Sequence, residues 1–489
     1  MIDNELKIVV NLISKEKKIE NVYCEIKLPK SDKEEIYINC FPTTDQFKEM
    51  IGSHKFKIIG KPYDKFCFYD QIIVRDSIIT KILPNKISKT EKSYLIIILC
   101  MDFYGEYEKS NIDKNKSISG WFYVSLLASL SPNKVLDCKP SGEINVTPYS
   151  THKFSLDKKF TISFDTKYYY DSQLKYDEQI ANVSYFKNVA EFNFRGSIKE
   201  VEHYSTLLDD LLMLMSFAIR KRTVCTGWIA ESSSKYIIYI KRNIVIPSYK
   251  DENLLPNYLV EPNDLKIFLD HTFSKLYNLK HKEIIKRAIF PVPSANETGT
   301  EPSILLLFSC LESILLYHKK NKNYETIIDE DSFHIIRNDI ARNLKQLLKS
   351  YKSNDITKRK SEVLKKYDST RRKMFYDKIS ELNRPSFKMI LEDFCSDYSL
   401  VLDDLWPITD SETGISLSEI RNKLIHGEVF DPAKNKSLIV AEFHLQAIVE
   451  RMILKILEWD IKKTRVAKEK ITNNAIFRED LKYHMKSLS

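Results

Sequence analysis

The chain has 489 residues, more than one hydrophobic core normally organises, so two or three domains are expected. Its composition of 43% hydrophobic, 11% aromatic and 29% charged residues is typical of a folded, soluble protein and argues against extensive disorder. A net charge of +9 permits a polyanionic partner without requiring one.

The sequence lacks the motifs of several common cofactor-binding, metal-binding and hydrolase sites. Only 10 residues are glycine, and the phosphate-binding patterns G-x-G-x-x-G and G-x-x-x-x-G-K-[ST] do not occur. The patterns H-E-x-x-H, G-x-S-x-G and C-x-x-C are also absent, and the eight cysteines are scattered. We therefore expect no cofactor and no metal, in a reduced cytoplasmic protein.

The N-terminus lacks a secretory signal pattern and the apolar runs are too short to cross a membrane, so no membrane partner is expected.

The first two hundred residues are predicted to form short β-strands, because β-branched and aromatic runs alternate there with polar clusters. The strongest candidates are 55–60, 94–103, 120–127, 159–170 and 189–196. Their spacing favours an antiparallel fold, either sandwich-like or barrel-like. A long helix is predicted over about 197–220, where apolar residues recur at helical spacing, and two further strands follow it.

The pattern changes from strands to helices after a segment with three prolines at 247–264. This predicts a β-rich region at 1–255 and an all-α domain at 256–489, an α+β multidomain protein overall. The predicted helices are 263–290, 301–320, 333–352, a segment around 358–383, 385–404, 416–426 and 437–465.

The helix at 416–426 carries clear signals at both of its ends. Ser416 followed by Glu419 has the spacing of a capping box, and Gly427 fits the left-handed position that ends a helix. Leu417, Ile420 and Leu424 form an apolar stripe that is expected to face the core.

The other faces of this helix carry polar side chains that point to a site. Asn422 and His426 are four residues apart and share a face, whereas Arg421 is about 140° around an ideal helix from His426. One helix alone therefore does not bring Arg421 and His426 together. A long arginine side chain or a second copy of the helix would be needed.

The segment "RNKLIH", with Arg421, Asn422 and His426, resembles the R-x4–6-H motif of HEPN-domain ribonucleases, whose common form is R-N-x-x-x-H. In that family two protomers pack so that both motifs face one cleft. The resemblance implies a homodimer with a composite site and an endoribonuclease that needs no metal. It implies catalytic roles for Arg421, Asn422 and His426, and products with a 2′,3′-cyclic phosphate and a 5′-OH.

The layout of a β-rich region before a helical domain also resembles the ApeA-type anti-phage proteins. This implies an abortive-infection nuclease that binds and cleaves RNA, with tRNA as one candidate target. It also implies a β-rich region that senses a phage-derived trigger or restrains the nuclease. The alternatives are a non-catalytic HEPN module that binds a nucleotide or a protein, and a structural helical domain.

Two further features bear on this hypothesis. Glu312 lies inside an apolar helix and needs a cationic or hydrogen-bonding partner, for which Arg421 is one candidate and an exposed face the alternative. The segment 358–373 contains eight basic residues, which predicts either a phosphate-contacting strip or an ordinary solvated surface. A second R-x4–6-H match, Arg478 to His484, lacks the adjacent asparagine and is interpreted as accidental.

Overall fold

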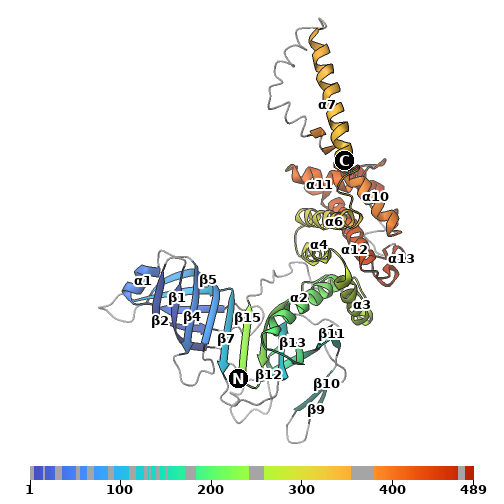
Figure 1. Cartoon of the computed structure of the whole chain (residues 1–489). Coiled ribbons are helices and arrows are strands. Elements are labelled where there is room, and N and C mark those ends of the chain that lie inside the picture. Colours follow the sequence, from blue (N-terminus) through green and yellow to red (C-terminus); the bar gives the residue numbers. More distant parts are fainter. Residues whose placement is uncertain are drawn as a thin grey trace. The chain divides into compact units, whose positions relative to one another are not determined.

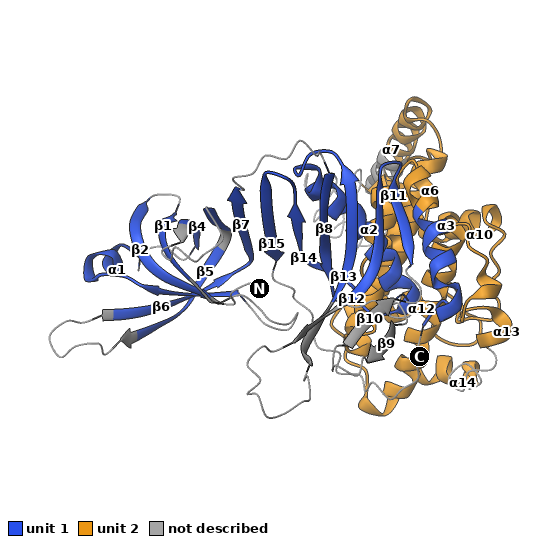
Figure 2. Ribbon diagram, turned by 90° about the horizontal axis from the view of Figure 1, so that it is seen from below, with its two compact units in different colours: residues 1–273 blue, residues 274–489 orange. Residues whose placement is uncertain are grey.

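The structure is a computed structural model, shown in Figure 1. It forms two compact units, Met1–Phe273 and Ser274–Ser489 (Figure 2). The predicted boundary at 255/256 falls within 242–257, outside the described residues. The structure describes residues 5–14, 17–27, 36–50, 55–62, 71–85, 93–108, 117–125, 130, 134–138, 144–148, 152–170, 183–241, 258–353, 378–379, 381–471 and 480–489.

The first unit consists mainly of antiparallel β-strands, with two helices. The strands are β1 (Glu5–Ile13), β2 (Lys18–Lys27), β3 (Ile36–Phe41), β4 (Lys55–Pro62), β5 (Gln71–Asn85), β6 (Ser93–Cys100), β7 (Asp102–Glu108), β8 (Ser117–Val124), β9 (Lys134–Cys138), β10 (Ile144–Pro148), β11 (Lys153–Asp157), β12 (Phe160–Tyr170), β13 (Val183–Arg195), β14 (Cys225–Glu231) and β15 (Lys235–Lys241). The helices are α1 (Thr44–Met50) and α2 (Glu200–Ile219).

Six of these strands close into a barrel. Their order is β5-β4-β1-β2-β3-β6, and the pairing of β6 with β5 completes the ring. The residues alternate between interior and exterior, as a closed sheet requires. On β1, for example, Ile8, Val10 and Leu12 are fully buried inside the barrel. The apolar runs of the N-terminal region therefore fill the interior of this barrel.

Strand β5 joins the barrel to a second sheet. Residues 71–73 of β5 pair with β7, and residues 77–85 of the same strand pair with β6. From β7 the sheet continues as β7-β15-β14-β8-β13-β12-β11, an open sheet of seven strands. The strands β9 and β10 pair only with each other in a separate hairpin.

The open sheet packs one of its faces on α2 through aromatic side chains. The ring of Phe160 stacks on Tyr204 of α2 at a centroid distance of 3.7 Å, and it also contacts Phe122, Phe192 and Phe194. Helix α2 ends at Arg220, which adopts the left-handed conformation with φ 53°. The predicted helix at about 197–220 is thus confirmed.

The second unit is helical. Its elements, together with η2 just before it and α3 across the boundary between the units, are η2 (Pro262–Asp264), α3 (Leu265–Asn278), α4 (Lys282–Ile289), α5 (Val292–Ala295), α6 (Thr300–Lys322), α7 (Glu330–Ser353), α10 (Phe387–Asp397), α11 (Leu417–Ile425), η3 (Pro432–Lys434), α12 (Asn435–Ile456), η4 (Ile461–Lys463), α13 (Lys468–Ile471) and α14 (Leu481–Leu488). The fold class of a β-rich region followed by a helical region is therefore confirmed.

Helix α6 is the centre of the helical unit, because it contacts α4, α5, α10, α11 and α12. By length and composition alone α6 could cross a membrane, but half of its apolar window is buried within the structure. Packing on five neighbouring helices accounts for this apolar character.

Candidate functional site

Helix α11 begins with the predicted capping box. The Ser416 hydroxyl accepts a hydrogen bond from the Glu419 backbone N–H at 3.3 Å, and the Glu419 carboxylate accepts one from the Ser416 N–H at 2.7 Å. Hydrogen bonds from the Ser416 backbone and hydroxyl hold the pKa of Glu419 below its ordinary value. These bonds satisfy backbone N–H groups that a helix start otherwise leaves unpaired.

The same helix ends in the predicted left-handed glycine. Gly427 has φ +79°, and its N–H donates to the Leu424 carbonyl at 3.1 Å. The N–H of Glu428 donates to the Lys423 carbonyl at 3.0 Å, which completes a Schellman motif. His426 is the C-cap residue, so its imidazole projects from the point where the helix stops.

The buried face of α11 is shorter than the predicted apolar stripe of Leu417, Ile420 and Leu424. Leu417 and Ile420 are fully buried, but Leu424 is only half-buried. Burial of the first turn alone anchors the helix at its N-terminal end and leaves the His426 end at the surface. The Leu417 N–H, which donates to the Pro407 carbonyl at 3.0 Å, adds to this anchoring.

Asn422 and His426 line one open pocket of about 430 Å³, as their shared face predicts. Both side chains are exposed. The pocket is lined by Gly414, Ile415, Glu419, Asn422, Lys423, His426, Glu428 and Ser489. Its lining carries one imidazole, one amide, one ammonium and two carboxylates.

Arg421 points to a different neighbour. Its Nη2 donates to Oε1 of Glu312 on α6 at 2.7 Å, and its Nη1 donates to Oδ1 of Asn422 at 3.2 Å. The side chains of Arg421 and Glu312 are 32% and 49% exposed, so water screens the pair. The partner suspected for Glu312 is thus Arg421.

Asn422 connects the two sides of this site. It contacts the Arg421 guanidinium and also lines the His426 pocket, whereas Arg421 is not among the residues described around that pocket. The structure therefore brings Asn422 to His426 within one chain. It does not place Arg421 in the same cavity, in agreement with the angular separation expected on one helix.

Two large apolar side chains are exposed beside His426. Ile425 is 52% exposed and Val429 is 88% exposed. Single apolar residues at a surface are common, but these two lie close together in the sequence, at the end of α11 and just after it.

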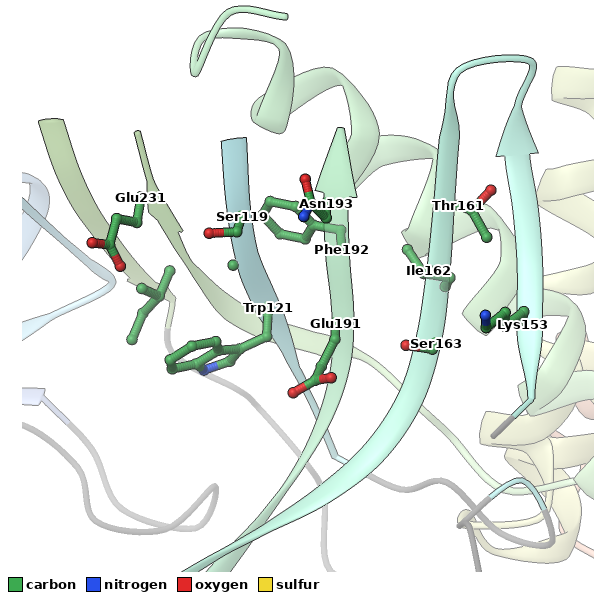
Figure 3. A pocket seen from close by; sticks show the side chains of 12 residues that line it. Ser119, Trp121, Lys153, Thr161, Ile162, Ser163, Glu191, Phe192, Asn193 and Glu231 are labelled. Carbon is green, nitrogen blue, oxygen red and sulfur yellow. The ribbon is translucent and has the colours of Figure 1, made fainter. Parts of the chain in front are cut away.

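A second pocket, of about 450 Å³, lies on the open sheet of the first unit (Figure 3). Its lining comes from β8, β11, β12, β13 and β14 and includes Trp121, Glu191 and Glu231. The sequence patterns did not indicate it, because its side chains come from strands that are far apart along the chain.

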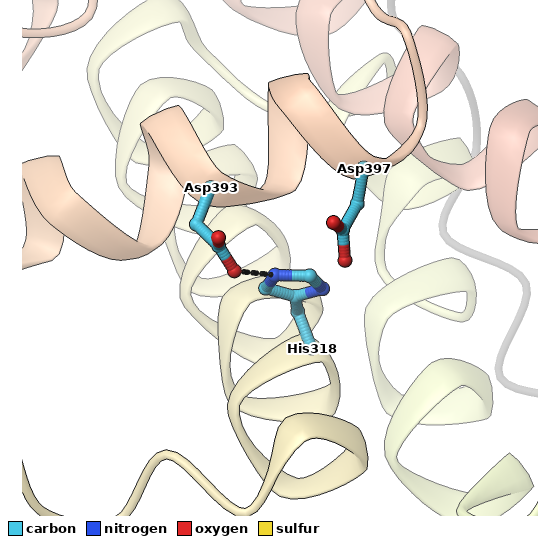
Figure 4. Close-up of side chains that lie close together, drawn as sticks. All are labelled: His318, Asp393 and Asp397. Carbon is cyan, nitrogen blue, oxygen red and sulfur yellow. Dashed lines mark hydrogen bonds and ion pairs between the residues drawn. The ribbon is translucent and has the colours of Figure 1, made fainter.

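His318 on α6 has two carboxylate neighbours. Its Nε2 lies 2.8 Å from Oδ2 of Asp393 on α10, and Asp397 lies one turn further along the same helix (Figure 4). Among the described residues these three could hold a metal ion, with ligand atoms within 4.8 Å of one another. The Lys322 ammonium already lies 2.5 Å from Asp397, so the cluster forms a charge network without a metal. The i, i+4 spacing of the two aspartates was the available sequence signal.

The structure does not test the remaining predicted features together. The basic segment 358–373 lies outside the described residues, as does Arg478. His484 is 2% exposed, and its Nδ1 lies 2.9 Å from the Ser437 hydroxyl, which gives it an internal partner.

Comparison of the chain with models of known protein families, with curated proteins and with solved structures finds no match.

Proposed function

We propose that the protein is a metal-independent endoribonuclease of anti-phage defence that acts as a homodimer, with tRNA as one candidate substrate. Arg421, Asn422 and His426 form its composite site. The observation that carries the proposal is that α11 and its C-cap carry all three side chains, with Asn422 and His426 lining a cavity at the exposed end of the helix. A capping box and a Schellman motif fix the helix there, and a cavity opens at His426.

The chemistry needs only groups that RNA and this helix supply. RNA carries its own nucleophile, the 2′-OH, which attacks the adjacent phosphorus and expels the 5′-oxygen. His426 would take the proton from the 2′-OH or give one to the departing oxygen, because an imidazole titrates near neutral pH. The products are a 2′,3′-cyclic phosphate and a 5′-OH.

Arg421 would bind the phosphate oxygens as negative charge develops on them. A guanidinium has five N–H donors, and the two hydrogen bonds described for Arg421 leave donors for a phosphate. Asn422 would orient Arg421 through its Oδ1 and present its amide to the cavity. Glu312 would hold the guanidinium in place until RNA binds.

A second copy of the chain supplies what one copy lacks. Arg421 of one protomer would face His426 of the other across a shared cleft, which removes the angular separation within a single helix. The exposed side chains of Ile425 and Val429 support this, because burying them against a partner would be favourable by the hydrophobic effect. The site and the dimer contact therefore share one end of α11.

A non-catalytic module that binds a nucleotide or a protein is the second candidate. It is favoured by the contact of Arg421 with Glu312, which keeps the guanidinium outside the His426 pocket within one chain. Such a module would bind RNA or nucleotide without cleaving it.

Cleavage of total tRNA in EDTA by the purified chain tests the proposal. Arg421→Ala and His426→Ala are each expected to lower the rate by roughly 10²- to 10⁴-fold, the usual contribution of such groups. Arg287→Ala and His334→Ala, at exposed positions on other helices, serve as matched controls and should keep the wild-type rate. Cleavage that persists in either site variant, or that needs a metal, would contradict the mechanism.

Mixing the two inactive variants tests the composite site. If Arg421 and His426 act across the dimer, a mixed dimer of the two variants retains one intact site. Random exchange would then restore about a quarter of the wild-type rate, because half of the dimers are mixed and each has one of two sites. No recovery after verified exchange would place both residues in the same chain's site.

A further inference from the structure

The open sheet of the first unit has a second face that the proposed nuclease does not use. One face buries Phe122, Phe160 and Phe192, and the Phe160 ring stacks on Tyr204 of α2. Because side chains alternate along a strand, the residues between these phenylalanines project from the opposite face. That face contains the pocket of about 450 Å³, a volume within the range of small-ligand sites.

The strand register aligns the side chains of this face in a row across five strands. Ile229 pairs with Trp121, Trp121 with Glu191, Glu191 with Ser163, and Ser163 with Lys153. Figure 3 shows Trp121 and Glu191 next to each other on neighbouring strands. Strands spaced about 4.8 Å apart make this row roughly 19 Å long.

A second row runs parallel to the first, two residues further along each strand. Glu231 pairs with Ser119, and Ser119 pairs with Asn193. These three side chains are exposed. The Ser117 hydroxyl donates to Oδ1 of Asn193 at 2.7 Å, which orients the Asn193 amide. Thr161, also exposed, lines the pocket from β12.

The charges on this face select against a polyanion and against a single metal ion. Among the residues that line the pocket there are two carboxylates, Glu191 and Glu231, and one ammonium, Lys153, so the lining itself does not attract phosphate groups. The two carboxylates belong to β13 and β14, which lie on either side of β8. Two strand spacings together with the register offset of two residues put their Cα atoms about 12 Å apart, too far to share one ion.

The chemistry that matches both rows is that of a sugar. The flat indole of Trp121 offers an apolar platform to the C–H face of a pyranose ring. Carboxylates accept hydrogen bonds from vicinal hydroxyl groups, while the Asn193 amide and the Lys153 ammonium donate to ring and hydroxyl oxygens. The hydroxyls of Ser119 and Thr161 can do both. A row of roughly 19 Å suits several linked sugar units better than one.

We propose that this face of the sheet binds a neutral oligosaccharide, with Trp121 as the stacking platform and Glu191, Asn193 and Glu231 as hydroxyl-binding groups. The proposal is independent of the nuclease, since its residues lie in the other compact unit. It gives the β-rich unit a ligand class of its own.

Calorimetric titration of the full chain with cellohexaose, maltohexaose, xylohexaose and chitohexaose tests this inference. At least one of these neutral hexasaccharides should bind at concentrations up to about 5 mM, with an affinity that Glu191→Gln lowers about tenfold. Trp121→Ala should abolish measurable binding. Because Trp121 also packs against buried apolar residues of the first unit and its truncation affects folding, Asn193→Ala at an exposed position provides an independent variant.

The controls separate this site from the nuclease and from other ligands. Glu202→Gln, an exposed carboxylate on α2, and His426→Ala should both bind the sugar with wild-type affinity. The proposal is overturned if none of the four hexasaccharides binds. It is equally overturned if oligogalacturonate or a single-stranded RNA binds as tightly, or if Glu191→Gln and Asn193→Ala leave the affinity unchanged.

Discussion

Arg451 and His444 lie on α12 inside the helical unit, whereas Arg421 and His426 lie on and beside α11 at its surface. Arg451 is 3% exposed and binds Asp404 through both Nη atoms, at 2.7 and 2.6 Å, while its Nε donates to the Val466 carbonyl. Arg421 makes one contact with a carboxylate and stays half-exposed. An arginine and a histidine are thus buried with internal partners on α12, whereas the arginine and histidine of α11 remain accessible to a ligand.

The two histidines differ in the same way. His444 is 3% exposed, and its Nδ1 accepts a hydrogen bond from the Trp406 N–H at 3.2 Å, which requires a neutral nitrogen. Burial lowers the pKa of His444 to about 4. His426 is exposed at a helix end. Burial, not residue type, therefore sets the pKa of His444 apart from that of an ordinary imidazole.

The largest effect is expected from breaking the buried ion pair. Arg451→Ala should lower the free energy of unfolding by about 3–5 kcal/mol, because it leaves the Asp404 carboxylate buried without its partner. Urea unfolding of the helical unit measures this loss. The double variant Arg451→Met with Asp404→Leu should be more stable than the single one. Equal losses in the single and double variants would show that the ion pair itself supplies the stability.

The pH dependence of stability should report His444. Between about pH 6.5 and 4 the unfolded imidazole binds a proton that the folded one does not, so stability falls as the pH falls. The loss is roughly 3 kcal/mol across this window. His444→Gln should flatten the dependence measured by urea unfolding, whereas His426→Gln should not. An unchanged slope in His444→Gln would assign the dependence to other groups.

Removing the N-cap of α11 should have a smaller effect. Ser416→Ala deletes the side-chain acceptor of the capping box and should cost about 1 kcal/mol. Hydrogen exchange should then rise in the amides of α11 before it rises in α12. Ser313→Ala, in the middle of α6, is the matched control and should be neutral or slightly stabilising. A loss as large for Ser313→Ala would indicate that the cap is not the cause.

The smallest change in stability is expected at the exposed ion pair. Glu312→Gln should alter the free energy of unfolding by less than about 1 kcal/mol, since both side chains are partly in water. Under the proposed mechanism it should nevertheless change the rate of tRNA cleavage, because it frees the Arg421 guanidinium. Glu325→Gln, an exposed carboxylate elsewhere, should change neither quantity. A large loss of stability in Glu312→Gln would place Arg421 with Arg451 as a structural residue.

The features that the sequence predicted well depend on residues close together along the chain. Ser416, Glu419 and Gly427 determine the ends of α11 through hydrogen bonds that span only a few positions. The change from strands to helices was also predictable, since each element follows from its own periodicity.

Other features depend on contacts between distant residues. Arg421 and Glu312 are 109 residues apart, and His318 and Asp393 are 75 residues apart, so no local pattern determines either pair, and Arg421 could be only one candidate partner for Glu312. Closure of the barrel likewise requires β6 to pair with β5 rather than continue an open sheet. Local sequence patterns therefore could not distinguish a barrel from a sandwich, because the strands of both folds show the same alternation of apolar and polar residues.

The shared strand β5 also bears on how the protein avoids self-association. An ordinary sheet has two edges, each a row of unpaired backbone groups on which another chain can add a strand. Here one end of the thirteen-stranded sheet curls back onto β5, so that among its described strands only β11 retains an edge. That strand is five residues long, and Lys153 and Asp157 at its two ends are exposed and charged. Closure of the barrel therefore removes one of the two edges to which another chain could add a strand. The edge that remains is a short strand with a charged residue at each end, which disfavours such pairing.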